Sequence, residues 1–278
     1  MFRKFLFIHI QIFTVITLSQ SISFTEKVNR TGEHILQGLN ESLEWYDAPI
    51  MTVFLTTRYL ELSDNNKIKI KTPFFESSFQ SEIGNSGHFT LGSIDKNTLP
   101  FAIMFARGAY VLGKDLFTEQ GSTAEAYKHA ALFQKSLIYT YTLTELVKNI
   151  TARKRPDNSD SKSFFSGHAS TTFTAASFIY REVDSYFDEC SLTANDFTLR
   201  TTLKTLSFAT LYGWAGFVGY SRIHDNKHYL SDVLVGAAVG IFMGNMMYRS
   251  YFSNDDRKFD LGLNYIHTVP SLTVQYKF

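Results

Sequence analysis

The chain has 278 residues, of which 27 are Lys or Arg, 26 are Asp or Glu and one is Cys. A net charge of +1 supplies no basic field for nucleic acid, and 19% charged residues beside 44% hydrophobic ones suit neither a disordered chain nor one made mostly of membrane spans. The single Cys excludes an internal disulfide framework and any zinc or iron–sulfur site built from clustered cysteines.

Residues 1–21 have the layout of a secretory signal peptide. Arg3 and Lys4 give a basic start, Phe5–Leu18 is mostly apolar, and Ser19-Gln-Ser21 places small residues before a cleavage point. An uncleaved anchor is the alternative, although crossing a bilayer takes about 20 apolar residues. We therefore expect an exported protein of the periplasm or cell envelope.

Residues 22–97 are predicted to form an N-terminal segment that is partly helical and partly irregular. Apolar residues such as Ile35 and Leu39 recur at helical spacing within residues 32–62, and Ile68-Lys-Ile70 is a candidate short strand. Residues 98–252 are predicted to form the core domain, an all-α bundle with helices near 98–116, 123–149, 167–187, 198–220 and 229–250.

The predicted core helices resemble those of a globular bundle more than membrane spans. The most apolar stretch, Val233–Met247, runs without a polar residue only to Gly244, short of about 18 residues. Gly236, Gly240 and Gly244 at four-residue spacing could mark a packing face in a membrane, but we favour close packing in a globular bundle.

The tail, residues 253–278, follows a different pattern. Phe259, Leu261 and Leu263 alternate with other residues, and the alternation resumes from Leu272 to Phe278. Two alternating runs joined by a short break predict a β-hairpin.

The first chemical motif lies at the end of the predicted helix 123–149. Lys148 and Arg155 are seven residues apart, and Pro156 follows directly. The helix has to end before Pro156, so Lys148 and Arg155 could both point into one pocket. A basic run at a helix C-terminus also stabilises the helix dipole, so the motif alone does not establish a site.

The second motif, Ser163-Phe-Phe-Ser166-Gly167-His168, opens the next helix. A Ser cap followed by Gly leaves backbone N–H groups at the positive end of the helix, where an anion can bind. His168 would lie in the first turn and could donate to that anion. An ordinary N-cap beside a surface histidine is the alternative.

The third motif joins Ser221-Arg222 to His228 and Asp232. Four-residue spacing at the start of a helix would place His228 and Asp232 on one face, about 5–6 Å apart between Cβ atoms. A carboxylate that accepts from one imidazole nitrogen leaves the other free as a base or nucleophile. Arg222 adds a planar fork suited to phosphate oxygens.

Together, the three motifs resemble the signature of the type 2 phosphatidic acid phosphatase and vanadium haloperoxidase superfamily. That signature is Lys-x6-Arg-Pro, then Pro-Ser-Gly-His, then Ser-Arg-x5-His-x3-Asp, and here Phe165 replaces the proline of the second motif. Phe165 supplies no ligand atom, so the change concerns the rigidity of the loop. The resemblance covers roughly residues 100–250 and implies a helical bundle of the acid phosphatase and haloperoxidase type.

The resemblance also implies a role for each motif residue. His228 would attack phosphorus and become a phosphohistidine, Asp232 would hold its other nitrogen, and His168 would protonate the leaving oxygen. The phosphate oxygens would be bound by Lys148, Arg155, Ser166, Gly167 and Arg222. Fixed cations can replace a metal in phosphoryl transfer, so we expect no cofactor and expect vanadate to act as an inhibitor.

Two other motifs are weaker. Gly108-Ala-Tyr-Val-Leu-Gly113-Lys114 has P-loop spacing, but Asp115 stands where Ser or Thr should hold magnesium, and the segment reads as helical. His224, His228 and Asp232 could imitate a zinc triad, although the Glu of the metalloprotease pattern is missing and Arg222 lies nearby.

The sequence therefore predicts a metal-independent phosphatase that hydrolyses phosphate monoesters. The main alternative is a lipid phosphatase at the membrane surface, acting on phosphatidate, undecaprenyl pyrophosphate or lipid A, because apolar helix faces do not reveal contact with acyl chains. A vanadium haloperoxidase and a non-catalytic envelope protein remain further alternatives. Peripheral membrane contact and a homo-oligomer are both compatible with the sequence.

Overall fold

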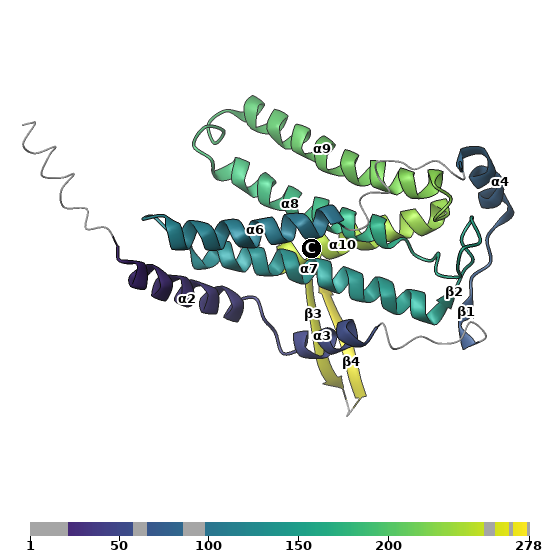
Figure 1. Ribbon diagram of the computed structural model, residues 1–278, viewed down its shortest axis with the longest axis horizontal. Coiled ribbons are helices and arrows are strands. Elements are labelled where there is room, and N and C mark those ends of the chain that lie inside the picture. The colour runs from purple at the N-terminus through teal and green to yellow at the C-terminus, as the bar shows by residue number, and fades with distance from the viewer. Residues whose placement is uncertain (1–21, 58–65, 86–97, 253–258, 267–268, 277–278) are drawn as a thin grey trace, which may run out of the picture.

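The computed structural model describes residues 22–57, 66–85, 98–252, 259–266 and 269–276. These residues form eight α-helices and two small two-stranded sheets (Figure 1). The predicted all-α fold class is thereby confirmed. The predicted signal peptide, residues 1–21, lies outside the described residues.

Five long helices make up the core and fall close to their predicted positions. They are α6 (Thr98–Phe117), α7 (Ala124–Ile150), α8 (Gly167–Glu189), α9 (Phe197–His224) and α10 (Leu230–Phe252). Side-chain caps explain three of the starts, since Thr123, Ser166 and Asp196 each accept a hydrogen bond from a backbone N–H three residues later. Helix α9 runs four residues beyond its predicted end at residue 220, which places Ser221 and Arg222 in its last turns.

Helix α8 lies at the centre of the bundle, between α7, α9 and α10 (Figure 1). Its tightest neighbour is α10, because Gly236, Gly240 and Gly244 bring the α10 backbone against the backbone of α8. The glycine stripe is thus a close helix–helix contact inside the bundle. The main apolar core joins α7, α8 and α10 and contains Leu132, Phe133, Leu137, Ala175, Phe178 and Met247.

Hydroxyl groups also link α7 to α8 in the interior. Thr140 Oγ1 lies 2.9 Å from Thr174 Oγ1, and Thr144 Oγ1 lies 3.0 Å from Ser170 Oγ. All four side chains are buried. Each hydroxyl also has a backbone carbonyl acceptor on its own helix, so the contacts between hydroxyls add polar links between α7 and α8 without leaving a buried group unpaired.

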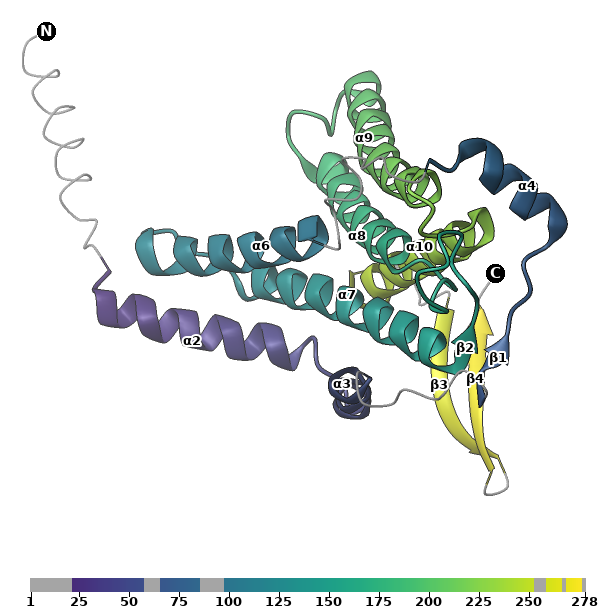
Figure 2. The same cartoon turned by 45° about the vertical axis from the view of Figure 1, so that its right-hand side comes forward.

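Two N-terminal helices pack against the side of the bundle, as Figure 2 shows: α2 (Phe24–Asn40) lies along α6 and α7, and α3 (Asp47–Thr56) contacts α7. Asp115 of α6 is fully buried and receives Arg30 Nε at 2.9 Å from α2. The buried Lys135 of α7 donates to Asp47 of α3 at 2.8 Å. The segment with P-loop spacing, Gly108–Lys114, therefore lies within helix α6, as its helical pattern predicted, and Asp115 forms a structural ion pair.

A third N-terminal helix, α4 (Phe74–Ile83), packs against α9 and α10 at the end of the bundle where α8 begins. The short strand β1 (Ile68–Lys69) precedes it and pairs in parallel with β2 (Thr151–Ala152), directly after α7. The candidate strand at Ile68-Lys-Ile70 is confirmed. This pairing brings the segment before α4 next to the loop that follows α7.

The tail contains the predicted hairpin. Strand β3 (Phe259–Ile266) pairs antiparallel with β4 (Val269–Tyr276), and Phe259 lies opposite Tyr276.

Helix α10 is long and apolar enough to cross a membrane by length and composition alone. Within its most apolar window, 39% of the residues are buried inside the protein. A buried core helix passes the same test, so this property by itself is weak evidence for a span.

Candidate active site

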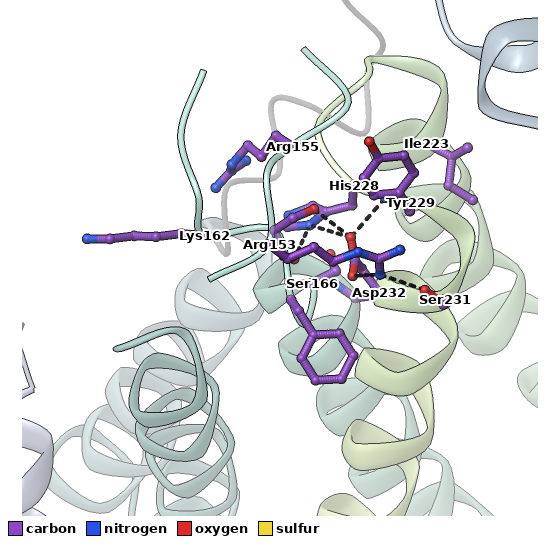
Figure 3. A network of polar contacts seen from close by, with 12 residues as sticks. Arg153, Arg155, Lys162, Ser166, Ile223, His228, Tyr229, Ser231 and Asp232 are labelled. Carbon is purple, nitrogen blue, oxygen red and sulfur yellow. Dashed lines mark hydrogen bonds and ion pairs between the residues drawn. The ribbon is translucent and has the colours of Figure 1, made fainter. Parts of the chain in front are cut away.

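The three motifs meet at one end of the bundle, where α7 ends, α8 begins and α9 turns into α10 (Figure 3). The Ser166 N–H donates to the Asp232 carbonyl at 3.0 Å, which joins the start of α8 to the start of α10. Lys227 Nζ lies 2.7 Å from Asp157 Oδ2 and joins the loop after α7 to the loop before α10. Motifs up to about 80 residues apart in sequence thus form one cluster.

Lys148 and Arg155 lie at the rim of the cluster, and each already contacts an acid. Lys148, in the last turn of α7, pairs with Glu145 at 3.0 Å, and Arg155 Nε pairs with Asp160 at 2.6 Å. A methyl group added at Gly167 would lie 3.2 Å from Lys148 Nζ, so this ammonium stands beside the start of α8. Because these pairs are partly exposed and weak, a bound anion can compete for both cations.

The start of α8 has the geometry of an anion site. Ser166 is the N-cap and its side chain accepts from the Ala169 N–H, and Gly167 begins the helix. His168 follows in the first turn, and its Nε2 is buried with no hydrogen-bonding partner among the described residues. A buried imidazole nitrogen left unpaired beside a positive helix end is a group poised for a ligand.

Arg222 approaches from α9 and is only 5% exposed. Its Nη1 lies 3.9 Å from Asp225 Oδ2, at the outer limit of an ion pair. Burial lowers the pKa of Arg222, with Arg155 acting in the same direction while Asp225 opposes it. An arginine remains charged even so, and Arg222 is therefore a third cation in the cluster.

His228 and Asp232 lie at the start of α10, and both are buried. His228 precedes the helix, and Asp232 occupies its first turn and accepts from the Tyr229 N–H at 2.9 Å. The predicted hydrogen bond between them is wrong in detail. His228 Nδ1 lies 2.7 Å from the Ser163 carbonyl oxygen but 3.8 Å from Asp232 Oδ2, which is too far for a hydrogen bond.

The Ser163 carbonyl determines the tautomer of His228. A carbonyl oxygen can only accept, so Nδ1 carries the proton and Nε2 retains its lone pair. Ser163 also donates its hydroxyl to Asp232 at 2.5 Å. Asp232 therefore acts on His228 mainly through Ser163 and by its charge.

Burial and neighbouring charge keep both histidines neutral at pH 7. Burial lowers the pKa of His168 to about 2, and the positive charges of Arg222, Lys148 and Arg155 act in the same direction, as does His228 when it is protonated. Burial likewise lowers the pKa of His228 to about 4, although Asp232 partly opposes it. Lys148 and Arg155 act on both rings, so the two histidines share one electrostatic environment.

Asp232 is ionised in these surroundings. Burial acts to raise its pKa, but contacts with His228 and Ser163, together with the charge of Arg153, hold that pKa below its ordinary value. A permanent carboxylate next to His228 favours the positively charged form of the imidazole.

Three residues that the motifs did not single out also belong to the cluster: Glu76, Arg153 and Ser163. Arg153 and Ser163 fall inside the first two motif segments, but nothing in their spacing distinguishes them from their neighbours. Glu76 comes from α4, far from the motifs in sequence, and no sequence pattern pointed to it.

The described part of the chain contains no cluster of side chains that would support the zinc alternative. No three His, Cys, Asp or Glu side chains are grouped there as a metal site requires. His224, one of the three candidate ligands, pairs instead with Asp225 at 3.3 Å.

Comparison with known proteins gives a family match for the part of the chain that carries these motifs. The PAP2 superfamily model matches residues 130–256, which include all three motifs. Residues 130–256 belong to the PAP2 superfamily. The resemblance inferred from the motifs is thereby confirmed.

The chain is also similar to a curated protein named lipid A 1-phosphatase from Porphyromonas gingivalis. The two are 36% identical over 96 residues, which is 34% of this chain and 18% of that protein. The chain thus matches less than a fifth of the length of this relative.

A crystal structure of a transmembrane PAP2 type phosphatidylglycerolphosphate phosphatase from Bacillus subtilis is also similar. It matches 83% of this chain and 98% of its own chain, with 14% sequence identity and a TM-score of 0.42.

Proposed function

We propose that this PAP2 protein is a phosphatase that hydrolyses phosphate monoesters through a phosphohistidine at His228. One observation carries the proposal: the buried His228 imidazole binds a carbonyl through Nδ1, and Lys148 and Arg155 lie close enough to lower its pKa, while Arg222 acts on the neighbouring His168. This arrangement leaves Nε2 as a nucleophile in a site that favours an anion.

The reaction would run in two steps. In the first, the Nε2 lone pair of His228 forms a bond to phosphorus and the ester P–O bond breaks, while His168 gives its proton to the leaving oxygen. In the second, His168 takes a proton from water, the water oxygen bonds to phosphorus, and the P–N bond breaks to release phosphate. Lys148, Arg155 and Arg222 would neutralise the phosphate oxygens in both steps.

His168 has to be protonated for the first step, although its pKa in the protein alone is about 2. A phosphate ester brings up to two negative charges against His168 and the three cations. This offsets the repulsion that lowers the pKa of His168, so the ring can take up a proton together with the substrate. His168 would then act as an acid only in the complex with substrate.

For the substrate, we infer a lipid phosphate. This was the main alternative from the sequence, and the similarity to a protein named lipid A 1-phosphatase supports it. A second observation agrees with it. Helices α9 and α10 carry exposed large apolar side chains, among them Leu206, Phe208 and Phe217 on α9 and Leu234 and Phe242 on α10. Such surfaces suit contact with acyl chains at a cell-envelope membrane.

The test of mechanism compares His228→Ala with His224→Ala in the purified full chain. His228→Ala should abolish turnover of every substrate and the trapping of an acid-labile phosphoenzyme, whereas His224→Ala should keep both. His168→Ala should slow alkyl phosphates by about 10²–10⁴-fold and nitrophenyl phosphate far less, because nitrophenolate needs little protonation to leave. Equal losses on the two substrates would remove His168 from the acid role.

The test of substrate class compares a lipid phosphate in vesicles with a soluble alkyl phosphate. We expect kcat/KM for the lipid phosphate to be at least about tenfold higher than for the soluble alkyl phosphate. An equal or lower value would instead favour a phosphatase of soluble monoesters. Halide oxidation with vanadate and peroxide, in place of simple inhibition by vanadate, would favour the haloperoxidase.

A further inference from the structure

The buried carboxylate of Asp232 is held by three donors from three parts of the chain. Arg153 Nη1 and Ser163 Oγ each donate to it at 2.5 Å, and the Tyr229 N–H donates at 2.9 Å. Asp232 has no exposed surface, and Arg153 is 2% exposed. Its position and charge thus depend on Arg153 as much as on its own helix.

Arg153 is fixed from its other side by α4. Its Nη2 donates to Glu76 Oε2 at 2.6 Å, and Glu76, also 2% exposed, accepts the Ser231 N–H at 2.6 Å through Oε1. Arg153 Nη1 also donates to Ser231 Oγ at 2.7 Å, and its guanidinium lies 4.6 Å from the centre of the Tyr229 ring. Figure 3 shows Arg153 reaching across to the start of α10.

We propose that Glu76 and Arg153 are positioning residues for His228, acting through Asp232 and Ser163. Arg153 orients the Asp232 carboxylate, Asp232 fixes the Ser163 hydroxyl, and the carbonyl of the same Ser163 binds His228 Nδ1. This inference rests on the proposed function, and it assigns to α4 a part in aiming the nucleophile.

Charge gives Glu76 a second effect. Arg153 carries one formal positive charge between two carboxylates, so Glu76, Arg153 and Asp232 together carry a net charge of minus one. His228 gains a positive charge when phosphorus bonds to Nε2 while the proton stays on Nδ1. The cluster therefore stabilises the phosphohistidine only if Glu76 balances Arg153 and leaves the charge of Asp232 for His228.

Other charged groups also face His228 and contribute to its pKa in wild type and in the variants. Asp232 lies on α10, while Lys148 from α7 and Arg155 from the following loop lower the pKa of His228. His168 of α8 also lies close enough to interact electrostatically with the ring. None of these groups changes in the variants below.

The experiment measures kcat and KM for Glu76→Gln, with Glu82→Gln as the matched control. Glu82 is an exposed acid on the same helix. Glu76→Gln should lower kcat by about 10–100-fold while KM and inhibition by inorganic phosphate change less than about threefold, because the phosphate-binding cations are untouched. Glu82→Gln should match wild type.

A pair of variants distinguishes loss of positioning and charge from simple loss of packing. Arg153→Met leaves two uncompensated carboxylates, whereas Arg153→Met combined with Glu76→Gln restores a net charge of minus one. The double variant should be at least about threefold more active than Arg153→Met alone, and Arg153→Lys should recover part of the loss. If the substitutions only damage the structure, the losses of activity in Arg153→Met and Glu76→Gln should multiply in the double variant.

A second readout does not depend on turnover. NMR titration of His228 in Arg153→Met should show its pKa raised by at least about one unit, because a nearby positive charge has been removed. Turnover of Glu76→Gln equal to that of Glu82→Gln, with the titration of His228 unmoved, would overturn the inference. A wild-type protein inert on every phosphate ester would refute the proposed function, and the NMR result would still decide the role of Arg153.

Discussion

Replacing Gly244 by Ala probes the contact between α8 and α10 on which the whole bundle depends. A methyl group at Gly244 would lie 2.6 Å from the Thr174 carbonyl oxygen and 2.9 Å from Ser177 Cβ, both on α8. Ordinary contact for such a methyl group begins near 3.4 Å. The helices would have to separate locally by several tenths of an ångström, because a backbone carbonyl cannot rotate aside as a flexible side chain can.

Two opposing terms set the expected size of the effect. Ala in place of Gly inside a helix stabilises by about 0.5–1 kcal/mol, since less backbone entropy is lost on folding. Overpacking a tight contact costs about 1–3 kcal/mol. We expect Gly244→Ala to lower the free energy of unfolding by about 1–2 kcal/mol once these terms are combined.

The matched control is Gly213→Ala on α9, where an added methyl group meets nothing within 4 Å. There only the helix-propensity gain remains, so the control should be more stable than wild type by up to about 1 kcal/mol. Urea unfolding followed by circular dichroism measures both variants, and their midpoints in a thermal scan should differ by roughly 5–10 °C. A Gly244→Ala protein as stable as the control would refute the close contact between α8 and α10.

Further predictions concern stability, metals and pH. Asp115→Asn should lower the free energy of unfolding at pH 7 by about 1.5–3 kcal/mol, because Arg30 and His34 lose a buried carboxylate partner. Burial acts to raise the pKa of Asp115, but its hydrogen bonds hold that pKa below its ordinary value. In urea unfolding, the difference in stability between wild type and variant should therefore shrink as the pH falls through this lowered pKa, because Asp115 is then protonated. Hydrolysis of a phosphate ester should continue in excess EDTA, and loss of activity that added zinc restores would contradict the role given to the cations. The kcat/KM profile should fall on the acid side near pH 4, where His228 takes up a proton and can no longer attack, and a rate unchanged from pH 3 to 7 would contradict that role.

Much of the architecture could be predicted because it follows from local patterns. Helix starts at Ala124, Gly167 and Phe197 come from a Ser, Thr or Asp cap directly before an apolar period, and the α7 helix ends before Pro156. The capped start of α8 was predictable for the same reason, since Ser166, Gly167 and His168 are neighbours in sequence.

Local sequence could not decide whether the three glycines of α10 pack in a membrane or in a globular bundle. Four-residue spacing indicates that one face of α10 is smooth but does not say what lies against it. The structure supplies α8 as the neighbour of Gly236, Gly240 and Gly244. The apolar length of α10 remains compatible with either setting.

The sequence by itself determined the family and the residue types of the site, because those chemical groups come in three short motifs with fixed spacing. Only the tertiary structure decided how His228 is held. Its partner is the backbone carbonyl of Ser163, a group that every residue carries and that no motif can reveal. Likewise, Arg153 meets Glu76 across 77 residues of chain, because an ion pair is specified by distance in space and leaves no periodic pattern in the sequence.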